Sequence, residues 1–323
     1  TSTKEEYENR RRDEAIGQTN KRNFMKRKAF LNYMQYEKRA SAHTITAYRK
    51  DIEQFFDYLQ MYYPDLDIPQ ISHLQIRSWV VSMLSNGLTP RSTNRKLSAL
   101  TSYFKYLRKY HHITHDPMLK VTAPKVGKRL PTVVEEQQMT QLFEQVEFGT
   151  DFIGQRNRLI LEILYNTGVR RSELVQLTID NIDLARQQIK VLGKGNKERL
   201  IPFGKSLTNA IIVYLQLRTQ TFPQTDSRHL LLNKKGEHVT PQLVYQVVKK
   251  YLSAVTTAEK RSPHVLRHSF ATHLADNGAD INAIKKLLGH ANLSATQIYT
   301  HNSIEKLKRV YEQAHPKAKK NGE

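Results

Sequence analysis

Residues 262–270 have the sequence SPHVLRHSF, the pattern of a helix start that presents polar side chains on one face. Serine at the cap and proline at the first helical position are typical of helix N-termini. His264 and Arg267 then lie side by side, whereas Leu266 and Phe270 point toward a core. Arg267 offers a planar fork of donors and the helix N-terminus favours an anion, so the pair suits a phosphate. The same two residues would also be found if they simply solvated an exposed helix start. The spacing alone does not distinguish a phosphate site from a solvated surface.

A second pattern lies downstream. Residues 287–290, LLGH, predict a helix that ends at Gly289 and is followed by His290. We expect a new helix after that, capped by Ser294 and containing Tyr299. The chain has 16 tyrosines, so position alone does not separate a nucleophile from a core side chain.

Two further basic segments lie upstream. Residues 167–174, TGVRRSEL, follow an apolar helix expected around residues 158–166. Residues 189–202 have period-two character around a turn, GKGNK, which predicts a β-hairpin with Lys194 near its tip. Taken separately, a surface arginine cluster and a solvated turn are the simpler interpretations.

Composition limits the classes of partner. The chain has 323 residues, 39% of them hydrophobic, which suggests about two domains. Lysine and arginine number 51 against 30 acidic residues, a net charge of +21, so a polyanion and above all nucleic acid is the expected partner. Absence of cysteine excludes disulfides, thiol nucleophiles and cysteine-ligated metal sites. No apolar run approaches the roughly 18 residues of a membrane span, and no secretory signal is evident, so we expect a cytoplasmic protein.

Periodicity predicts the domain organisation. Residues 1–24 have the composition of a charged, flexible extension, and residues 25–122 form a helical domain. Prolines, glycine and lysines break the pattern at residues 123–131, which we interpret as a linker. Residues 132–323 form the second domain. The predicted helices of the first domain include one behind a Ser41 cap, one at residues 73–85 and one after Thr89-Pro90.

Taken together, the four segments resemble the tyrosine recombinases of the phage-integrase family in order and form. The resemblance is greatest to the Xer subgroup, the bacterial recombinases that resolve chromosome dimers, and extends from about residue 26 to residue 316. It implies a mainly α fold with a small β-sheet in the C-terminal domain. The N-terminal helical domain would bind core DNA, and the C-terminal domain would be catalytic and end in a docking helix.

The resemblance also implies a nucleophile and a phosphate clamp. Tyr299 would attack a DNA phosphodiester, form a 3′-phosphotyrosine and release a 5′-hydroxyl, with no cofactor and no metal. Arg170 and Arg267 would hold the non-bridging oxygens, and His290 would donate a further hydrogen bond. Alignment with the family's first box selects Arg170 over the adjacent Arg171.

Three further roles follow from the same resemblance. Lys194, rather than Lys197, would protonate the departing 5′-oxygen. His264 would position the phosphate and assist with the proton of the tyrosine, whose ordinary pKa is about 10. Glu173 would orient the site. Other histidines, at positions 268, 273 and 301, raise a metal as an alternative, but the nearby arginines would repel a cation.

The expected partners are double-stranded DNA with a specific recombination site and a homo- or hetero-tetramer with a related recombinase. A DNA translocase is a further candidate, and no membrane is expected. Candidate DNA-binding residues in the first domain are Arg49, Arg91, Arg95 and Lys96, for which a solvated basic face is the simpler alternative. An apolar stripe at Ile304, Leu307, Val310 and Tyr311 would dock on a neighbouring subunit. A mobile-element integrase, a type IB topoisomerase and a non-enzymatic DNA-binding protein stay open as alternatives.

Overall fold

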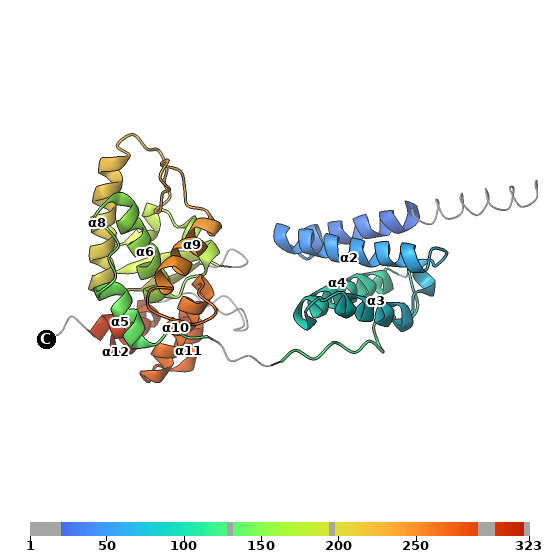
Figure 1. Cartoon of the computed structure of the whole chain (residues 1–323). Coiled ribbons are helices and arrows are strands. Elements are labelled where there is room, and N and C mark those ends of the chain that lie inside the picture. Colours follow the sequence, from blue (N-terminus) through green and yellow to red (C-terminus); the bar gives the residue numbers. More distant parts are fainter. Residues whose placement is uncertain (1–20, 111, 128–131, 194–197, 290–300, 320–323) are drawn as a thin grey trace, which may run out of the picture. The chain divides into compact units, whose positions relative to one another are not determined.

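The computed structural model of the chain describes residues 21–110, 112–127, 132–193, 198–289 and 301–319 (Figure 1). The chain divides into two compact units, Thr1–Arg129 and Leu130–Glu323. Within the described ranges, no helix combines the length and the apolar character needed to cross a bilayer.

The first unit is built from helices whose starts were predictable. The Ser41 hydroxyl accepts a hydrogen bond from the backbone N–H of Thr44, and Thr89 caps the next long helix in the same way through Ser92. Residues 21–24, which we expected in a flexible extension, are already helical and continue to residue 32. The elements are η1 (Tyr33–Glu37), α2 (Ala42–Tyr62), η2 (Ile68–Gln70), α3 (His73–Ser85) and α4 (Pro90–Lys109).

Aromatic side chains fill the core of this unit. Phe30, Phe55, Tyr103 and Phe104 are fully buried, and the Phe55 ring lies 5.1 Å from that of Trp79. A polar contact also joins α2 to α4. The buried carboxylate of Asp51 on α2 is paired with two basic side chains of α4, Arg95 and Lys96.

The second unit is organised around one buried helix, α6 (Phe152–Thr167), against which α8, α9 and α10 pack (Figure 1). Every residue of α6 from Leu159 to Thr167 is buried, so its C-terminal half is covered by the other helices. The other helices of this unit are α5 (Glu136–Glu144), α7 (Arg171–Gln176), η3 (Ile179–Asn181), α8 (Lys205–Thr221), α9 (Pro241–Leu252), α10 (Pro263–Asp276), α11 (Ile281–Leu288), α12 (His301–Ala314) and α13 (Pro316–Lys319).

A three-stranded antiparallel sheet lies beside these helices and confirms the predicted hairpin. Its order is β1 (Ile182–Asp183), β2 (Gln188–Leu192) and β3 (Glu198–Pro202). The register pairs Leu192 with Glu198, so the hairpin loop begins and ends at these two residues. The expectation of a mainly α chain with a small sheet in the C-terminal domain is therefore confirmed.

The described side chains of α12 pack partly into the core of their own unit. Leu307 and Tyr311 of α12 are buried in the core of their own unit, and the Tyr311 hydroxyl donates to Asn166 Oδ1 of α6 at 3.2 Å. Leu307 and Tyr311 are thus covered within the chain, and Val310 packs partly against the same core; docking of this helix on a neighbouring subunit stays a prediction. The side chain of Ile304 and the predicted Ser294 cap lie outside the described residues.

Candidate active site

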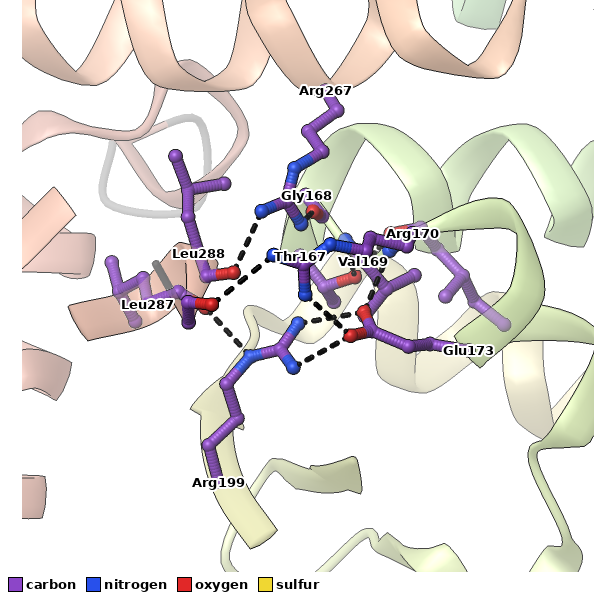
Figure 2. Close-up of polar contacts among 11 residues, drawn as sticks. Thr167, Gly168, Val169, Arg170, Glu173, Arg199, Arg267, Leu287 and Leu288 are labelled. Carbon is purple, nitrogen blue, oxygen red and sulfur yellow. Dashed lines mark hydrogen bonds and ion pairs between the residues drawn. The ribbon is translucent and has the colours of Figure 1, made fainter. Parts of the chain in front are cut away.

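Three arginines and one glutamate converge where the loop after α6, strand β3, α10 and the end of α11 meet (Figure 2). Arg170 precedes α7, Arg199 lies on β3 and Arg267 lies on α10. Segments from four parts of the sequence therefore supply one cluster.

Glu173 is the anion of this cluster. Its Oε2 accepts the backbone N–H of Arg170 at 2.7 Å and its Oε1 accepts Arg170 Nη1 at 2.8 Å, a capping box that begins α7. The carboxylate is buried, which by itself raises a pKa, but the hydrogen bonds and charge of Arg199, followed by those of Arg170, lower the pKa of Glu173 to about 2. Glu173 is ionised at every physiological pH.

Arg199 holds the other edge of the same carboxylate. Its Nη1 donates to Glu173 Oε1 at 2.9 Å and its Nη2 to Oε2 at 2.8 Å, while Nε donates to the carbonyl oxygen of Leu287 at 3.0 Å. This parallel fork is the strongest geometry for an arginine and a carboxylate.

The C-terminal end of α11 receives all three arginines. Carbonyl oxygens at a helix end lack intrahelical partners and carry partial negative charge. Arg267 Nη2 donates to the carbonyl oxygen of Leu288 at 2.6 Å, and Arg170 Nη2 donates to that of Gly289 at 3.1 Å. Arg199 Nε donates to the carbonyl oxygen of Leu287, as described above. Gly289 ends the helix with φ 64°, as the sequence pattern predicts.

Arg267 is held from two sides. In addition to Leu288, its Nη1 donates to the carbonyl oxygen of Gly168, the left-handed residue that ends α6. Burial, followed by the charges of Arg170 and Arg199, lowers the pKa of Arg267 to about 10, so it stays charged at neutral pH. Among the described residues, three cations face one carboxylate here, and an anion such as a phosphate would compensate the excess charge.

His264 stands at the exposed start of α10, one turn before Arg267. Burial, then His268 and the neighbouring arginines, lower the pKa of His264 below its ordinary value of 6.5. The imidazole is therefore neutral at pH 7 and able to accept a proton. His273, by contrast, is a core residue whose Nδ1 lies 2.9 Å from the Tyr165 hydroxyl.

The structure brings together Arg170, Glu173 and Arg267, with His264 on the same helix as Arg267. Lys194, His290 and Tyr299 lie outside the described residues, as does Lys197. Gly289, which immediately precedes His290, belongs to the cluster through its carbonyl oxygen. Across the described ranges, no group of three or more histidine, aspartate or glutamate side chains is arranged to hold a metal ion.

The proposed DNA-binding residues of the first unit fall into two groups. Arg49 and Arg91 are exposed. Lys96 is buried, with its ammonium 3.1 Å from Asp51 Oδ1 and hydrogen-bonded to Gln54, and the half-exposed Arg95 pairs with the same Asp51. Lys96 therefore has a structural partner inside the domain, which argues against our interpretation of it as a phosphate contact.

Sequence reasoning missed Arg199. It stands in the stretch 198–202 that we assigned to the returning strand of the hairpin, where an arginine is easily interpreted as an outward-facing charge. A signal was present, because the alternation around Leu200 places Arg199 on the same face as Ile201, which is fully buried.

Each of the two units of the chain matches a family model. The phage integrase family matches residues 132–306, and the phage integrase N-terminal SAM-like domain matches residues 28–111. The chain is 37% identical to tyrosine recombinase XerC of Bacillus pumilus over 294 residues, covering 90% of this chain and 95% of the relative. It is 36% identical to tyrosine recombinase XerD of Staphylococcus haemolyticus over 293 residues, covering 90% and 98%.

A solved structure is similar over both units. The XerH site-specific recombinase bound to difH substrate in a pre-cleavage complex matches with a TM-score of 0.63 and 26% identity, covering 81% of this chain and 78% of that chain. The chain belongs to the phage integrase family of tyrosine recombinases. It is accordingly an enzyme of site-specific DNA recombination, which cleaves and rejoins DNA strands. The family resemblance inferred from the motifs is confirmed.

Proposed function

We propose that Tyr299 is the nucleophile and that it attacks a DNA phosphodiester held by Arg170 and Arg267. The phenolic oxygen forms a bond to phosphorus, the bond from phosphorus to the 5′-oxygen breaks, and a 3′-phosphotyrosine remains. Rejoining reverses these steps with a 5′-hydroxyl from another strand, so no external energy source is needed.

One observation carries the proposal: Arg170 and Arg267 both donate to backbone carbonyl oxygens at the end of α11, and Arg170 is also paired with Glu173. Such preorganised donors stabilise charge that develops in a transition state without reorganising during the reaction. The excess positive charge around Arg267 supports a dianionic, five-coordinate phosphorane as the species that the cluster fits. We assign His290, next to Gly289, a further hydrogen bond to the same phosphate.

Two groups would manage protons. His264 is neutral because burial and the adjacent cations lower its pKa, and a neutral imidazole is able to accept the proton of Tyr299. Lys194, in the loop between Leu192 and Glu198, would protonate the leaving 5′-oxygen.

We further propose that the biological role is of the Xer type, the resolution of chromosome dimers in the cytoplasm during chromosome segregation. The XerC and XerD relatives, matched over nine-tenths of this chain, support that assignment. Four protomers would act on two duplexes, either as copies of this chain or together with a related recombinase, and a DNA translocase would activate them. Arg49 and Arg91 of the helical domain would contact DNA phosphates.

The test is covalent capture on a nicked suicide DNA carrying candidate recombination sites, read on a denaturing gel. Wild-type protein should form an adduct, and Tyr299→Phe should form none while still binding the site. An absence of adduct with every DNA and salt concentration, by a folded protein that binds the site, would refute the proposed nucleophile.

The clamp is tested separately. Arg170→Ala and Arg267→Lys should slow cleavage by about 10²–10³-fold or more, with site binding largely retained. A matched control is Arg228→Ala, which removes an exposed arginine paired only with exposed Asp180 in the same unit and should cleave normally. Equal loss of binding and cleavage in the clamp variants would mean that these arginines mainly hold DNA.

The role is tested in cells. Deletion of the gene should leave unresolved chromosome dimers, which the wild-type gene restores and the Tyr299→Phe gene does not. Normal segregation without the gene, together with recombination at the ends of a mobile element, would favour an integrase. Relaxation of supercoiled DNA without site preference or strand exchange would favour a topoisomerase.

A further inference from the structure

Arg199 is a buried arginine beside a more exposed one. Only 4% of its side chain is exposed, and its Nε, Nη1 and Nη2 all donate to groups inside the protein. Arg170, by contrast, has 35% of its side chain exposed. Arg170 is therefore accessible to a phosphate and Arg199 is not, so any part that Arg199 plays in the reaction passes through its neighbours.

Those neighbours are the two groups that hold the Arg170 guanidinium (Figure 2). The first is Glu173, whose Oε1 accepts Arg170 Nη1 at 2.8 Å and Arg199 Nη1 at 2.9 Å. The second is the end of α11, where Arg170 Nη2 donates to the carbonyl oxygen of Gly289. Arg199 Nε donates to the carbonyl oxygen of Leu287 at the same helix end, and a Cβ added at Gly289 would lie only 3.1 Å from Arg199 Cδ. Arg199 thus contacts both supports of Arg170.

Stability alone is a weak explanation for a buried arginine in this position. A buried ion pair gains little over well-packed apolar side chains, because both charges lose their hydration. What a bidentate fork does supply is a fixed position and orientation of the carboxylate. The charge of Glu173 also depends on it, since burial raises the pKa of this carboxyl and Arg199, more than Arg170, lowers it to about 2.

Charge decides what Arg170 is able to offer a phosphate. Among the described residues of the cluster, three arginines face one carboxylate, an excess of two positive charges. Without Arg199 the excess would be one, and Arg170 would be the only arginine hydrogen-bonded to Glu173. Opposite charges attract strongly in a buried site, so the carboxylate would then neutralise the Arg170 guanidinium and draw it inward.

We propose that Arg199 is a positioning residue of the phosphate clamp: it neutralises and orients Glu173, so that the charge of Arg170 stays directed at the scissile phosphate. This inference rests on the proposed function, in which Arg170 and Arg267 hold that phosphate. Arg199 does not contact the reacting atoms in this role and acts only through Glu173 and the end of α11.

The role predicts how the cleavage rate depends on the charge of the phosphate. A methylphosphonate carries a methyl group in place of one non-bridging oxygen, so it has one negative charge and one hydrogen-bond acceptor less. Each of its two diastereomers lacks a different oxygen. A residue that acts through Arg170 should matter least for the diastereomer that lacks the oxygen bound by Arg170. A residue that only keeps the protein folded should matter equally for every substrate.

The experiment measures single-turnover cleavage by the full chain at saturating protein on the phosphate and on both methylphosphonates. Arg170→Ala identifies the diastereomer on which that variant is least slowed relative to wild type. Arg199→Met should slow cleavage of the phosphate by about 10–100-fold, less than loss of a clamp donor itself, and should cleave that diastereomer within a few-fold of wild type. Equal slowing on all the substrates, or no slowing on the phosphate, would overturn the inference.

A second measurement uses the natural phosphate alone and tests the charge directly. Glu173→Gln combined with Arg199→Met removes the carboxylate together with the cation that neutralises it. This double variant should cleave several-fold faster than Arg199→Met, because no uncompensated carboxylate is left to draw Arg170 away from DNA. A double variant no faster than Arg199→Met would contradict the proposed charge compensation.

A matched control is Arg218→Met. Arg218 is another buried arginine of the same unit, and it donates to the carbonyl oxygens of Ser227 and His229 outside the cluster. Its loss should leave the ratio of phosphate to methylphosphonate cleavage at the wild-type value. A changed ratio would mean that general destabilisation explains the Arg199 result. Thermal melting and site binding check that each variant is folded.

The same rates separate this inference from the proposed function. If Arg170→Ala were slowed equally on the phosphate and on both methylphosphonates, the clamp role of Arg170 would be refuted, and the inference with it. If one diastereomer relieved the defect of Arg170→Ala but not that of Arg199→Met, only the positioning role would be refuted.

Discussion

His315 and Tyr165 are joined by a hydrogen bond from the imidazole Nε2–H to the backbone carbonyl oxygen, 3.2 Å long. The other ring nitrogen, Nδ1, accepts the backbone N–H of Lys317 at 3.2 Å. The side chain is fully buried between α12 and α13. A protonated Nδ1 would be shielded from solvent and could no longer accept the Lys317 N–H. Burial therefore lowers the pKa of His315 to about 3.

Stability of the chain should therefore fall as the pH drops below about 6.5, the ordinary histidine value. The unfolded state takes up the proton of His315 first, because the folded pKa is lower, so each pH unit costs up to about 1.4 kcal/mol for this group. His264 and His273, whose pKa values are also lowered by burial, act in the same direction. Chemical unfolding of the full chain between pH 7.5 and about 5 measures the slope.

The control variant is His315→Gln, whose amide is able to make both hydrogen bonds without titrating. Its free energy of unfolding should decline less steeply over the same range. Glu173 does not interfere, because its stabilising effect is lost only below its ordinary value of 4.5, toward about 2. An unchanged slope in His315→Gln would contradict the assignment to His315.

The sequence predicts local features of this fold well and long-range pairings poorly. The bounds of α3, the caps Ser41 and Thr89, and the turn at Gly289 follow from signals within a few residues. Family motifs selected Arg170, Glu173 and Arg267, which the structure brings together.

The missed features depend on partners that are distant in the chain. Arg199 takes its role from Glu173 and Leu287, and Lys96 is buried because Asp51 lies on another helix. Side-chain charge in a sequence gives no sign of whether its partner is solvent, DNA or a carboxylate.

Gly168 should tolerate no side chain. It has φ 59°, and an added Cβ would collide with the Phe270 ring and lie 3.0 Å from Leu288 Cδ2. Since its carbonyl oxygen also holds Arg267, Gly168→Ala should destabilise the chain by about 2–4 kcal/mol and slow cleavage in the folded fraction. Thermal unfolding and suicide-substrate cleavage measure the two effects.

Gly278→Ala separates backbone strain from collision. Gly278 has φ 83°, but an added Cβ would meet nothing within 4 Å. Gly278→Ala should therefore destabilise the chain by only about 1 kcal/mol, and the variant should cleave DNA as wild type does. Equal costs at the two glycines would show that packing around Gly168 is not the dominant effect.

Lys317 should stabilise the C-terminal tail by neutralising a buried carboxylate. Its Nζ lies 2.6 Å from Oε1 of Glu162, which is fully buried on α6. In Lys317→Met the Glu162 carboxylate keeps only the more distant Arg158 and the amide of Asn166 as described partners. The substitution should therefore lower the free energy of unfolding by about 3 kcal/mol. Equilibrium unfolding in urea measures the loss.

The double variant Glu162→Gln, Lys317→Met tests the reason for that loss. Removing the carboxylate together with its partner should recover most of the stability, because the cost arises from the uncompensated charge. If the two substitutions were additive, the cation–π contact of the lysine ammonium with Phe143, whose ring centroid lies 3.7 Å from Nζ, would be the larger effect.

Arg91 and Lys96 lie on the same helix, α4, but should affect DNA binding differently. Arg91 is exposed, so Arg91→Ala should weaken binding most at low salt and reduce the slope of log affinity against log salt by about 1. Lys96 is occupied by Asp51 and Gln54, so Lys96→Met should leave that slope unchanged and lower stability by about 1–3 kcal/mol. Binding titrations on one DNA site at several salt concentrations, with unfolding of the same samples, measure both. A reduced slope in Lys96→Met would show that Lys96 does contact a phosphate, because the salt dependence reports the counterions released by such contacts.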